Sequence, residues 1–292
     1  IAIAVAAIQA LTSVVKRSKA TTMMGLEIEL KAAADKLKGC VPDKSSISLA
    51  AGCELFSRYV TRTSLDIPEF EQCKARLIER GERFAEMSLI SREIIAQLGD
   101  RFIRDGKVVL IHGFSRVVLA VLLYAAQQGK HFSVVTTEGR PNGSGYQAAV
   151  ELIKANIPVT LVLDAAVGYI MEKVDLVLTG AEGVVENGGI INKIGTYSIA
   201  IAAKAFKRPF YVAAESYKFA RLFPLNQSDL PEASENQKPL TPCTTNYPIS
   251  DKLKICNPAV DYTPPSFITL LFTDLGILTP SAVSDELIKL YY

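Results

Sequence analysis

The sequence has little net charge and no long apolar run, and each shortage removes a class of function. Its 32 Lys and Arg against 30 Asp and Glu leave a formal charge of +2, so no strong overall field attracts nucleic acid or an anionic membrane. The longest apolar run, residues 117–126, spans ten residues, about half of what a bilayer-spanning helix needs. We therefore expect no direct nucleic-acid partner and no membrane partner, and we interpret this run as a buried helix.

Cysteine and histidine are too sparse and scattered for a structural metal site. The five cysteines lack any CxxC spacing and only two histidines exist, so we expect no metal site and no disulfide framework. The apolar opening lacks a basic stretch followed by a cleavage site, and Ile1 indicates that the true start precedes it. These features predict a protein of a reducing compartment, the cytosol.

What is present is the composition of a soluble globular protein. Hydrophobic residues make up 49% and charged residues 21%, which excludes disordered, collagenous and coiled-coil chains. A length of 292 residues, at about 150 residues per domain, predicts one large or two modest domains.

The first third of the chain has helical periodicity. Apolar residues recur at intervals of three, four and seven over residues 73–98, and shorter versions of the pattern cover 26–37 and 49–60. The Ser45-Ser46 pair can supply an N-cap for the last of these. We predict an N-terminal helical domain over residues 1–104.

After Asp105-Gly106 short apolar runs alternate with helical segments, which is typical of a parallel sheet covered on both faces. We predict a Rossmann-like, open α/β domain over residues 105–292. A stretch at about 228–265 is rich in Pro, Asn, Ser and Thr, and this composition predicts a long loop. The expected strands are 108–111, 132–136, 159–163, 176–178, 210–213 and 268–272, and the expected helices are 116–128, 144–155, 165–172, 196–206 and 281–290.

Polar residues follow the predicted strands, at the edge where ligands bind in such sheets. A helix opening at Ser115-Arg116 would direct backbone N–H groups and a guanidinium at one place, which suits a phosphate. Ordinary alternatives stay open: Ser115 or Asp164 as a helix cap, and His112 as a structural residue. The glycine-rich segment 180–196 offers amide and amine side chains for a small anionic or polyhydroxyl ligand, or it is a structural loop with Thr196 as N-cap. The candidate phosphosugar or anion pocket comprises His112, Ser115, Arg116, Arg140, Ser144, Glu182, Asn187, Asn192 and Lys193.

Residues 143–148 match the pattern GxGxxA but do not predict a dinucleotide site. Six residues separate the first glycine from the end of its strand, whereas the dinucleotide fingerprint needs that glycine at the strand-to-helix turn. The sequence also has no GxxxxGK[ST] motif. We expect no cofactor.

Four long segments, at 159–173, 180–196, 210–225 and 272–289, closely resemble the family of alpha subunits of eukaryotic translation initiation factor 2B, as do residues 50–56. The resemblance covers essentially the whole chain. It implies a non-catalytic regulatory subunit of the guanine-nucleotide exchange complex for initiation factor 2. The implied partners are a second copy of the chain, the beta, gamma, delta and epsilon subunits, and the phosphorylated alpha subunit of initiation factor 2, whose binding inhibits exchange under stress.

The same fold family includes methylthioribose-1-phosphate and ribose-1,5-bisphosphate isomerases. The resemblance implies that these enzymes use a cysteine after the first strand and an aspartate after the fourth, where this chain has Gly113 and Glu182. Glycine has no side chain that can move a proton, and the extra methylene of glutamate shifts its carboxyl by about 1.5 Å. We therefore expect no catalytic residue. An active isomerase, or a sensor of a sugar phosphate or nucleotide, stays open as the alternative.

Two surfaces are predicted to bind proteins. The charged faces of the helical domain are the candidate contact with the phosphorylated partner, and a solvated helix surface is the alternative; the residues are Glu27, Glu29, Glu54, Arg58 and Arg62. The apolar C-terminal stretch is the candidate homodimer interface, and burial against its own sheet is the alternative. Its residues are Ile268, Leu270, Leu271, Phe272, Leu278 and Leu287.

Overall fold

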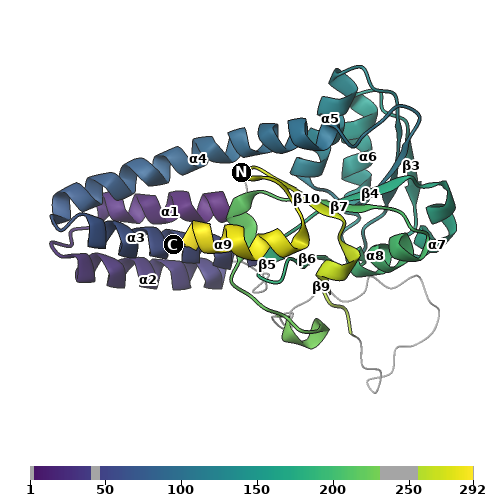
Figure 1. The fold of residues 1–292 in the computed structure, drawn as a ribbon. Coiled ribbons are helices and arrows are strands. Elements are labelled where there is room, and N and C mark those ends of the chain that lie inside the picture. Colours follow the sequence, from purple (N-terminus) through teal and green to yellow (C-terminus); the bar gives the residue numbers. More distant parts are fainter. Residues whose placement is uncertain (1–2, 41–46, 231–255, 292) are drawn as a thin grey trace, which may run out of the picture.

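A helical bundle forms the first third of the chain in the computed structural model, which describes residues 3–40, 47–230 and 256–291 (Figure 1). The predicted helical periodicity is confirmed, whereas the Ser45-Ser46 pair lies outside the described residues. Leu11, Leu26, Phe56 and Leu77 are each at most 2% exposed, because every helix directs its apolar stripe inward. The helices are α1 (Ile3–Arg17), α2 (Met23–Cys40), α3 (Ile47–Asp66) and α4 (Phe70–Asp100).

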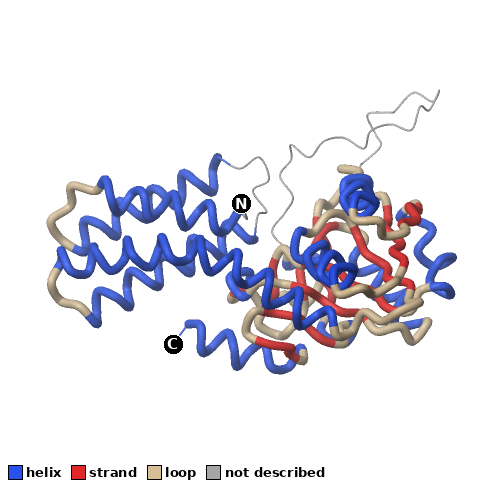
Figure 2. The backbone as a smooth tube through the Cα atoms, turned by 90° about the horizontal axis from the view of Figure 1, so that it is seen from above, coloured by secondary structure: helices blue, strands red, loops and turns tan. Residues whose placement is uncertain are grey.

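Helix α4 is long enough to belong to both halves of the molecule. Its 31 residues span about 46 Å at 1.5 Å per residue. The helix packs against α1 in the bundle, and also against α5 and β10 of the following domain. Figure 2 shows the helical bundle on one side of the molecule and the strands on the other. A Cβ added at Gly99 would lie 2.9 Å from Val121 of α5, so glycine permits this close approach.

The seven-stranded sheet has the order β11-β10-β7-β4-β1-β2-β3 and is parallel except for β11. The chain adds strands outward from β1 in one direction and then, from β4, in the other. The β1–β4 boundary is therefore the switch point at which ligands bind in such sheets. The strands are β1 (Val108–His112), β2 (Ser133–Thr137), β3 (Val159–Val162), β4 (Leu176–Gly180), β7 (Phe210–Ala213), β10 (Leu270–Thr273) and β11 (Gly276–Leu278).

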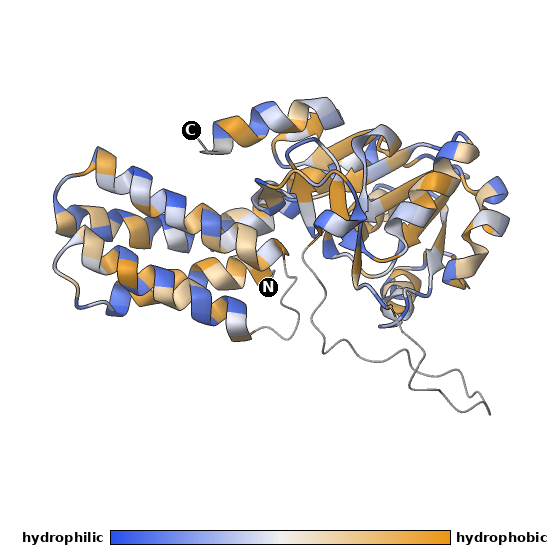
Figure 3. Ribbon diagram, turned by 90° about the horizontal axis from the view of Figure 1, so that it is seen from below, coloured by the Kyte–Doolittle hydropathy of each residue, from blue (hydrophilic) through white to orange (hydrophobic). Residues whose placement is uncertain are grey.

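Helices cover both faces of this sheet, as the alternating pattern predicts, and Figure 3 shows the most hydrophobic colouring on its strands. One face packs against α5, α6 and the end of α4, and the other against α7, α8 and α9. The predicted helix 165–172 is a single α-turn flanked by 3-10 turns. The helices are α5 (Arg116–Gln127), α6 (Ser144–Lys154), α7 (Val167–Ile170), α8 (Thr196–Ala205) and α9 (Val283–Tyr291).

A second, four-stranded sheet corrects two predictions. Segment 180–196 contains a hairpin of β5 and β6, and the predicted loop at 228–265 ends in a strand, β9. Residues 231–255 of that loop lie outside the described residues. These strands have only two to four residues, which is too short for the alternation of apolar and polar side chains to be recognised in the sequence. In addition, β9 pairs with β6 across about seventy intervening residues, so nothing local indicates the pairing. The strands are β5 (Gly183–Val185), β6 (Ile190–Lys193), β8 (Phe219–Ala220) and β9 (Val260–Thr263).

The apolar C-terminal stretch is largely internal, which corrects the predicted dimer interface. Ile268, Leu271, Phe272 and Leu287 are at most 7% exposed. The reason is that β10 pairs with β7 on one side and β11 on the other, and the helices on both faces cover its side chains. The two remaining predicted interface residues, Leu270 and Leu278, are half-buried.

Neither a membrane span nor a metal cluster occurs in the part of the chain that the structure describes. No helix there combines the length and the apolar character needed to cross a bilayer. No group of three or more His, Cys, Asp or Glu side chains is arranged to hold a metal ion.

Candidate functional site

His112, at the carboxyl end of β1, is a structural residue. Its ring is 6% exposed, with Nδ1 2.6 Å from Thr137 Oγ1 and Nε2 2.8 Å from Ile194 O. Because a carbonyl can only accept, Nε2 carries the proton and Nδ1 accepts from the threonine. Burial lowers the pKa of His112, although the bond to Ile194 opposes this. The ring is thus neutral and offers no free donor to an anion, contrary to its predicted place in the pocket.

Ser115 and Arg116 do not act together as predicted. Ser115 is the N-cap of α5, with its side chain accepting from Val118 N at 3.5 Å. Arg116 is exposed and lines a groove of about 760 Å³ between α4, α5 and α6, where Arg92 is also found. The capping alternative therefore describes Ser115, and Arg116 contributes to a different surface.

Gly113, Gly139 and Ser144 lie together at the carboxyl ends of the strands, and we call this cluster the strand-end site. Gly113 has a φ of 62° and Gly139 a φ of 70°, both in the left-handed region. A Cβ at either glycine would lie 2.9 Å from Ser144 Oγ, and one at Gly113 would also lie 3.7 Å from Lys193 Cδ. The Ser144 hydroxyl is buried with no hydrogen-bond partner among the described residues. The fold thus brings Ser144 and Lys193 to the same side of Gly113.

The loop after β2 is organised by Asp164. Its carboxylate accepts from Gly139 N at 2.9 Å and from Arg140 N at 2.8 Å, so it fixes the loop after the neighbouring strand rather than capping its own helix. The Arg140 guanidinium is 57% exposed, with Nε 3.8 Å from Glu138 Oε2. Arg140 therefore lies at the rim with an intramolecular partner.

The two asparagines of segment 180–196 have different structural partners: Asn187 bonds within the second sheet, and Asn192 joins that sheet to β4 and α8. Asn187 donates to Tyr262 OH at 2.7 Å and accepts from Gly189 N at 2.9 Å. Asn192 is buried and donates to Thr179 Oγ1 and Thr196 Oγ1 at 3.1 and 3.0 Å. Thr196 is the first helical residue rather than the N-cap, which is Gly195. Both side-chain amides thus form hydrogen bonds within the protein, which agrees with the interpretation of this segment as structural rather than ligand-binding.

Asp261 of β9 lies beside this site and is not among the predicted residues, because the sequence pattern predicts a loop where β9 lies. Its Oδ2 accepts from Gly195 N at 2.8 Å and Tyr197 N at 3.1 Å, at the start of α8. Oδ1 is buried and has no hydrogen-bond partner among the residues described. Burial raises the pKa of Asp261 to about 7, against the two backbone bonds.

We expect Asp261→Asn to raise the melting temperature at pH 7.5 by about 4 °C, with little effect near pH 4. The carboxyl has a higher pKa in the folded than in the unfolded chain, so its ionisation destabilises the fold increasingly as pH rises from about 4 to 7. An amide keeps an acceptor for Gly195 and Tyr197 without this penalty. Thermal denaturation between pH 4 and 8 measures the effect, with the exposed Asp105→Asn as control. Parallel curves for D261N and the wild type would contradict the assignment.

The five predicted partner-contact residues lie on two neighbouring helices, α2 and α3. Four of them, Glu27, Glu29, Glu54 and Arg62, are exposed, whereas Arg58 is half-buried. Their contact with a partner remains a prediction.

Comparisons with known proteins agree on one family. The model of the initiation factor 2 subunit family matches residues 1–280. The chain is 56% identical to translation initiation factor eIF2B subunit alpha of Dictyostelium discoideum, over all of this chain and 92% of that protein. It is 33% identical to ribose 1,5-bisphosphate isomerase of Archaeoglobus fulgidus, over 86% of this chain and 77% of the enzyme. The tetrameric eIF2B-beta2-delta2 complex from C. thermophilum has a similar fold, with a TM-score of 0.79 at 20% identity, over 99% of this chain and 88% of the matched one.

Proposed function

This chain belongs to the initiation factor 2 subunit family, and we propose that it is a non-catalytic regulatory subunit of the guanine-nucleotide exchange complex that acts on translation initiation factor 2. The observation that carries the proposal is the 56% identity over the entire chain to a protein named as the alpha subunit of eIF2B. The complex works on a cytosolic factor, so we place the protein in the cytosol.

In this proposal the two parts of the chain have different tasks. The α/β domain forms a homodimer that bridges two copies of the beta, gamma, delta and epsilon subunits. The exposed charges of α2 and α3, among them Glu27, Glu54 and Arg62, contact the phosphorylated alpha subunit of initiation factor 2. Binding of that phosphoprotein inhibits exchange under stress.

The geometry at Gly113 supports a non-catalytic role. Its φ of 62° is a conformation that residues with side chains rarely adopt. A Cβ there would also lie 2.9 Å from Ser144 Oγ, so a thiol in the ancestral place would need a local rearrangement. The strand-end site therefore has Lys193 and the Ser144 hydroxyl near position 113 but no proton-transfer group at that position.

Co-expression with the other four subunits tests the function. We expect the chain to co-purify with all of them, and the assembled complex to retain several times more phosphorylated than unphosphorylated initiation factor 2 alpha subunit. A variant with Arg62 changed to Gln should lose much of that preference while still assembling, because guanidinium groups attract a phosphate. Failure of the wild-type chain to co-purify would refute the proposal.

A second candidate, a sugar-phosphate isomerase or sensor, is favoured by the 33% identity to the archaeal isomerase. The same purified chain, incubated with ribose 1,5-bisphosphate and followed by NMR, is expected to leave the sugar unchanged. Turnover would support the enzyme. A selective rise in melting temperature with a phosphosugar, without turnover, would support a sensor.

A further inference from the structure

A cavity of about 240 Å³ lies where the helical bundle meets the α/β domain, and we call it the junction cavity. Its lining comes from α3 and α4 on one side, and from the 3-10 turn Ser216–Lys218, β8 and the turn between β10 and β11 on the other. Phe219 is 2% exposed, whereas Met87 and Leu275 are 46% and 39% exposed. The last two side chains therefore lie at the mouth of the cavity.

The walls of the junction cavity are mostly apolar, with aromatic rings from several elements. The rings of Phe84, from α4, and Tyr217, from the 3-10 turn, meet edge to face with their centroids 5.8 Å apart. Arg80 already lies over the ring of Tyr59, at 5.6 Å from its centroid. Phe84 and Tyr217 are thus the rings best placed to contact a ligand, and the faces of such rings attract organic cations.

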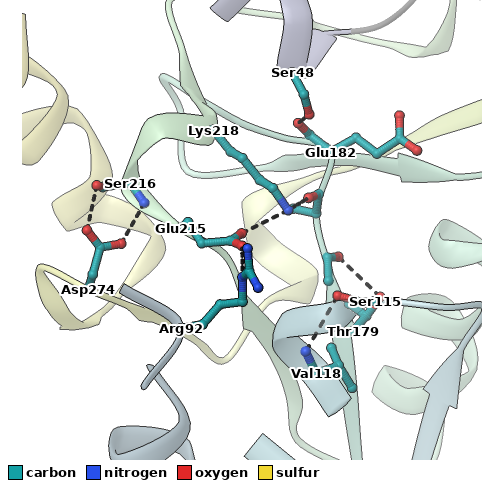
Figure 4. A network of polar contacts seen from close by, with 12 residues as sticks. Ser48, Arg92, Ser115, Val118, Thr179, Glu182, Glu215, Ser216, Lys218 and Asp274 are labelled. Atoms are coloured by element: carbon teal, nitrogen blue, oxygen red, sulfur yellow. Dashed lines mark hydrogen bonds and ion pairs between the residues drawn. The ribbon is translucent and has the colours of Figure 1, made fainter. Parts of the chain in front are cut away.

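Asp274, in the turn between β10 and β11, supplies the negative charge of the lining. It is the only charged residue among those that line the cavity. Its half-buried carboxylate accepts from Ser216 N and from Ser216 Oγ, both at 2.7 Å, as Figure 4 shows. These two bonds fix the carboxylate but leave its charge uncompensated, because no lysine or arginine of the described residues forms an ion pair with it. A cationic ligand would supply the missing partner.

The volume of the junction cavity restricts the size of that ligand. Pockets that hold drug-sized molecules measure roughly 300–1,000 Å³, so a cavity of about 240 Å³ suits a single ring with a short side chain. The Ser91 hydroxyl, also in the lining, donates to Met87 O at 2.8 Å and needs no partner from a ligand. The chemistry of the cavity is therefore that of aromatic walls with one carboxylate.

We propose that the junction cavity binds a small amphipathic amine, with its ring against Phe84 and Tyr217 and its ammonium group at Asp274. The cavity is distinct from the strand-end site, because none of the residues of that site lines it. A bound amine contacts both the helical bundle and the α/β domain, so it stabilises the folded arrangement of the two. The inference does not depend on the proposed function.

Calorimetric titration of the full chain with phenethylamine tests the proposal, with 2-phenylethanol as the matched neutral ligand. At neutral pH we expect the alcohol to bind at least about tenfold more weakly, because it lacks the charge that Asp274 attracts. Asp274→Asn should weaken binding of the amine by about tenfold and binding of the alcohol by less than about twofold. Asp285→Asn removes a carboxylate from an exposed position of α9 and should change neither affinity.

The methionine methyl groups report where the amine binds. In a chain labelled with methyl-¹³C methionine, phenethylamine should shift the NMR signal of Met87, at the mouth of the cavity, and leave that of Met24, exposed on α2, unchanged. Met87→Trp should obstruct the mouth and abolish calorimetric binding of both ligands. This second variant keeps the proposal testable if Asp274→Asn does not fold.

Three results would overturn the proposal. They are the absence of a saturable shift of the Met87 signal up to millimolar phenethylamine, equal affinities for the amine and the alcohol, and an unchanged preference for the amine in folded D274N. All of these measurements use the isolated chain. Co-purification with the other subunits is a separate experiment, so failure of the proposed function is recognised independently.

Discussion

Replacing Gly145 with alanine is expected to lower the melting temperature by about 10 °C or to prevent folding. The new Cβ would lie 1.8 Å from Thr137 O and 2.8 Å from the carbonyl carbon of the same residue. Both are backbone atoms of β2, so no side-chain rotation relieves the overlap. Gly145 N also donates to Glu138 O at 2.9 Å, which holds the start of α6 against the strand end. Moving α6 away would expose its buried residues, such as Ala148 and Leu152, at a cost of about 4 kcal/mol or more.

Thermal denaturation and the soluble yield of G145A measure this effect, with Gly168→Ala, whose added methyl has no atom within 4 Å, as the matched control. A G145A chain as stable as the wild type would show that α6 can shift freely, and our account of its packing on β2 would be wrong. The result also bears on the GxGxxA pattern. Its second glycine serves close packing of helix on strand, a role that requires no bound dinucleotide.

Replacing Glu215 with alanine is expected to cost about 3 kcal/mol or more, because Arg92 and Lys218 would then be left without their shared carboxylate. The Lys218 side chain is 16% exposed and that of Arg92 is 20% exposed. Neither charge can regain full hydration without movement at the junction of the two domains. Urea denaturation measures the loss. The double variant Glu215→Leu, Lys218→Met should be more stable than E215A, since it removes one unpaired charge together with the carboxylate.

The ion pair of Glu215 and Lys218 makes stability depend on pH with the opposite sign to Asp261. Burial raises the pKa of Glu215, but the charge and hydrogen bond of Lys218 outweigh it, so the net pKa lies below its usual value. The pair therefore stabilises the fold above the unfolded carboxyl's pKa of about 4.3, and this contribution is lost as pH falls through the folded value. Glu215→Gln should flatten the stability curve between about pH 5 and 3. An unchanged acid limb in E215Q would contradict the assignment.

Local features of the chain were predictable because their causes are local. The apolar period of residues 73–98 depends on side chains within one helix, and α4 contains that whole stretch. The apolar run at 117–126 similarly lies within α5. The absence of a thiol at Gly113 is a matter of residue identity and needs no coordinates. The resemblance motifs are also read residue by residue, and they identified the family that the comparisons confirm.

The composition of the pocket was predicted only in part, because hydrogen-bond partners are chosen by the fold. The sequence predicts His112 as a ligand, yet its ring nitrogen Nε2 is hydrogen-bonded to the carbonyl oxygen of Ile194, 82 residues away. Asn192 likewise donates its side-chain hydrogen bonds to Thr179 and Thr196. Arg116, adjacent to Ser115 in sequence, lines a separate groove, because Ser115 is the extended N-cap whose side chain turns back to Val118 N, whereas Arg116 begins the helix.

The amino-acid sequence by itself therefore determined the helical and α/β parts, the family and the absence of a thiol at position 113, since each depends on residue type or on a short period. Only the tertiary structure decided that β9 joins β6 across a long loop, that Phe272 is internal rather than an interface residue, and that Arg92 meets Glu215. These outcomes depend on which distant segments lie side by side. Contacts between segments so far apart produce no periodic pattern in the sequence.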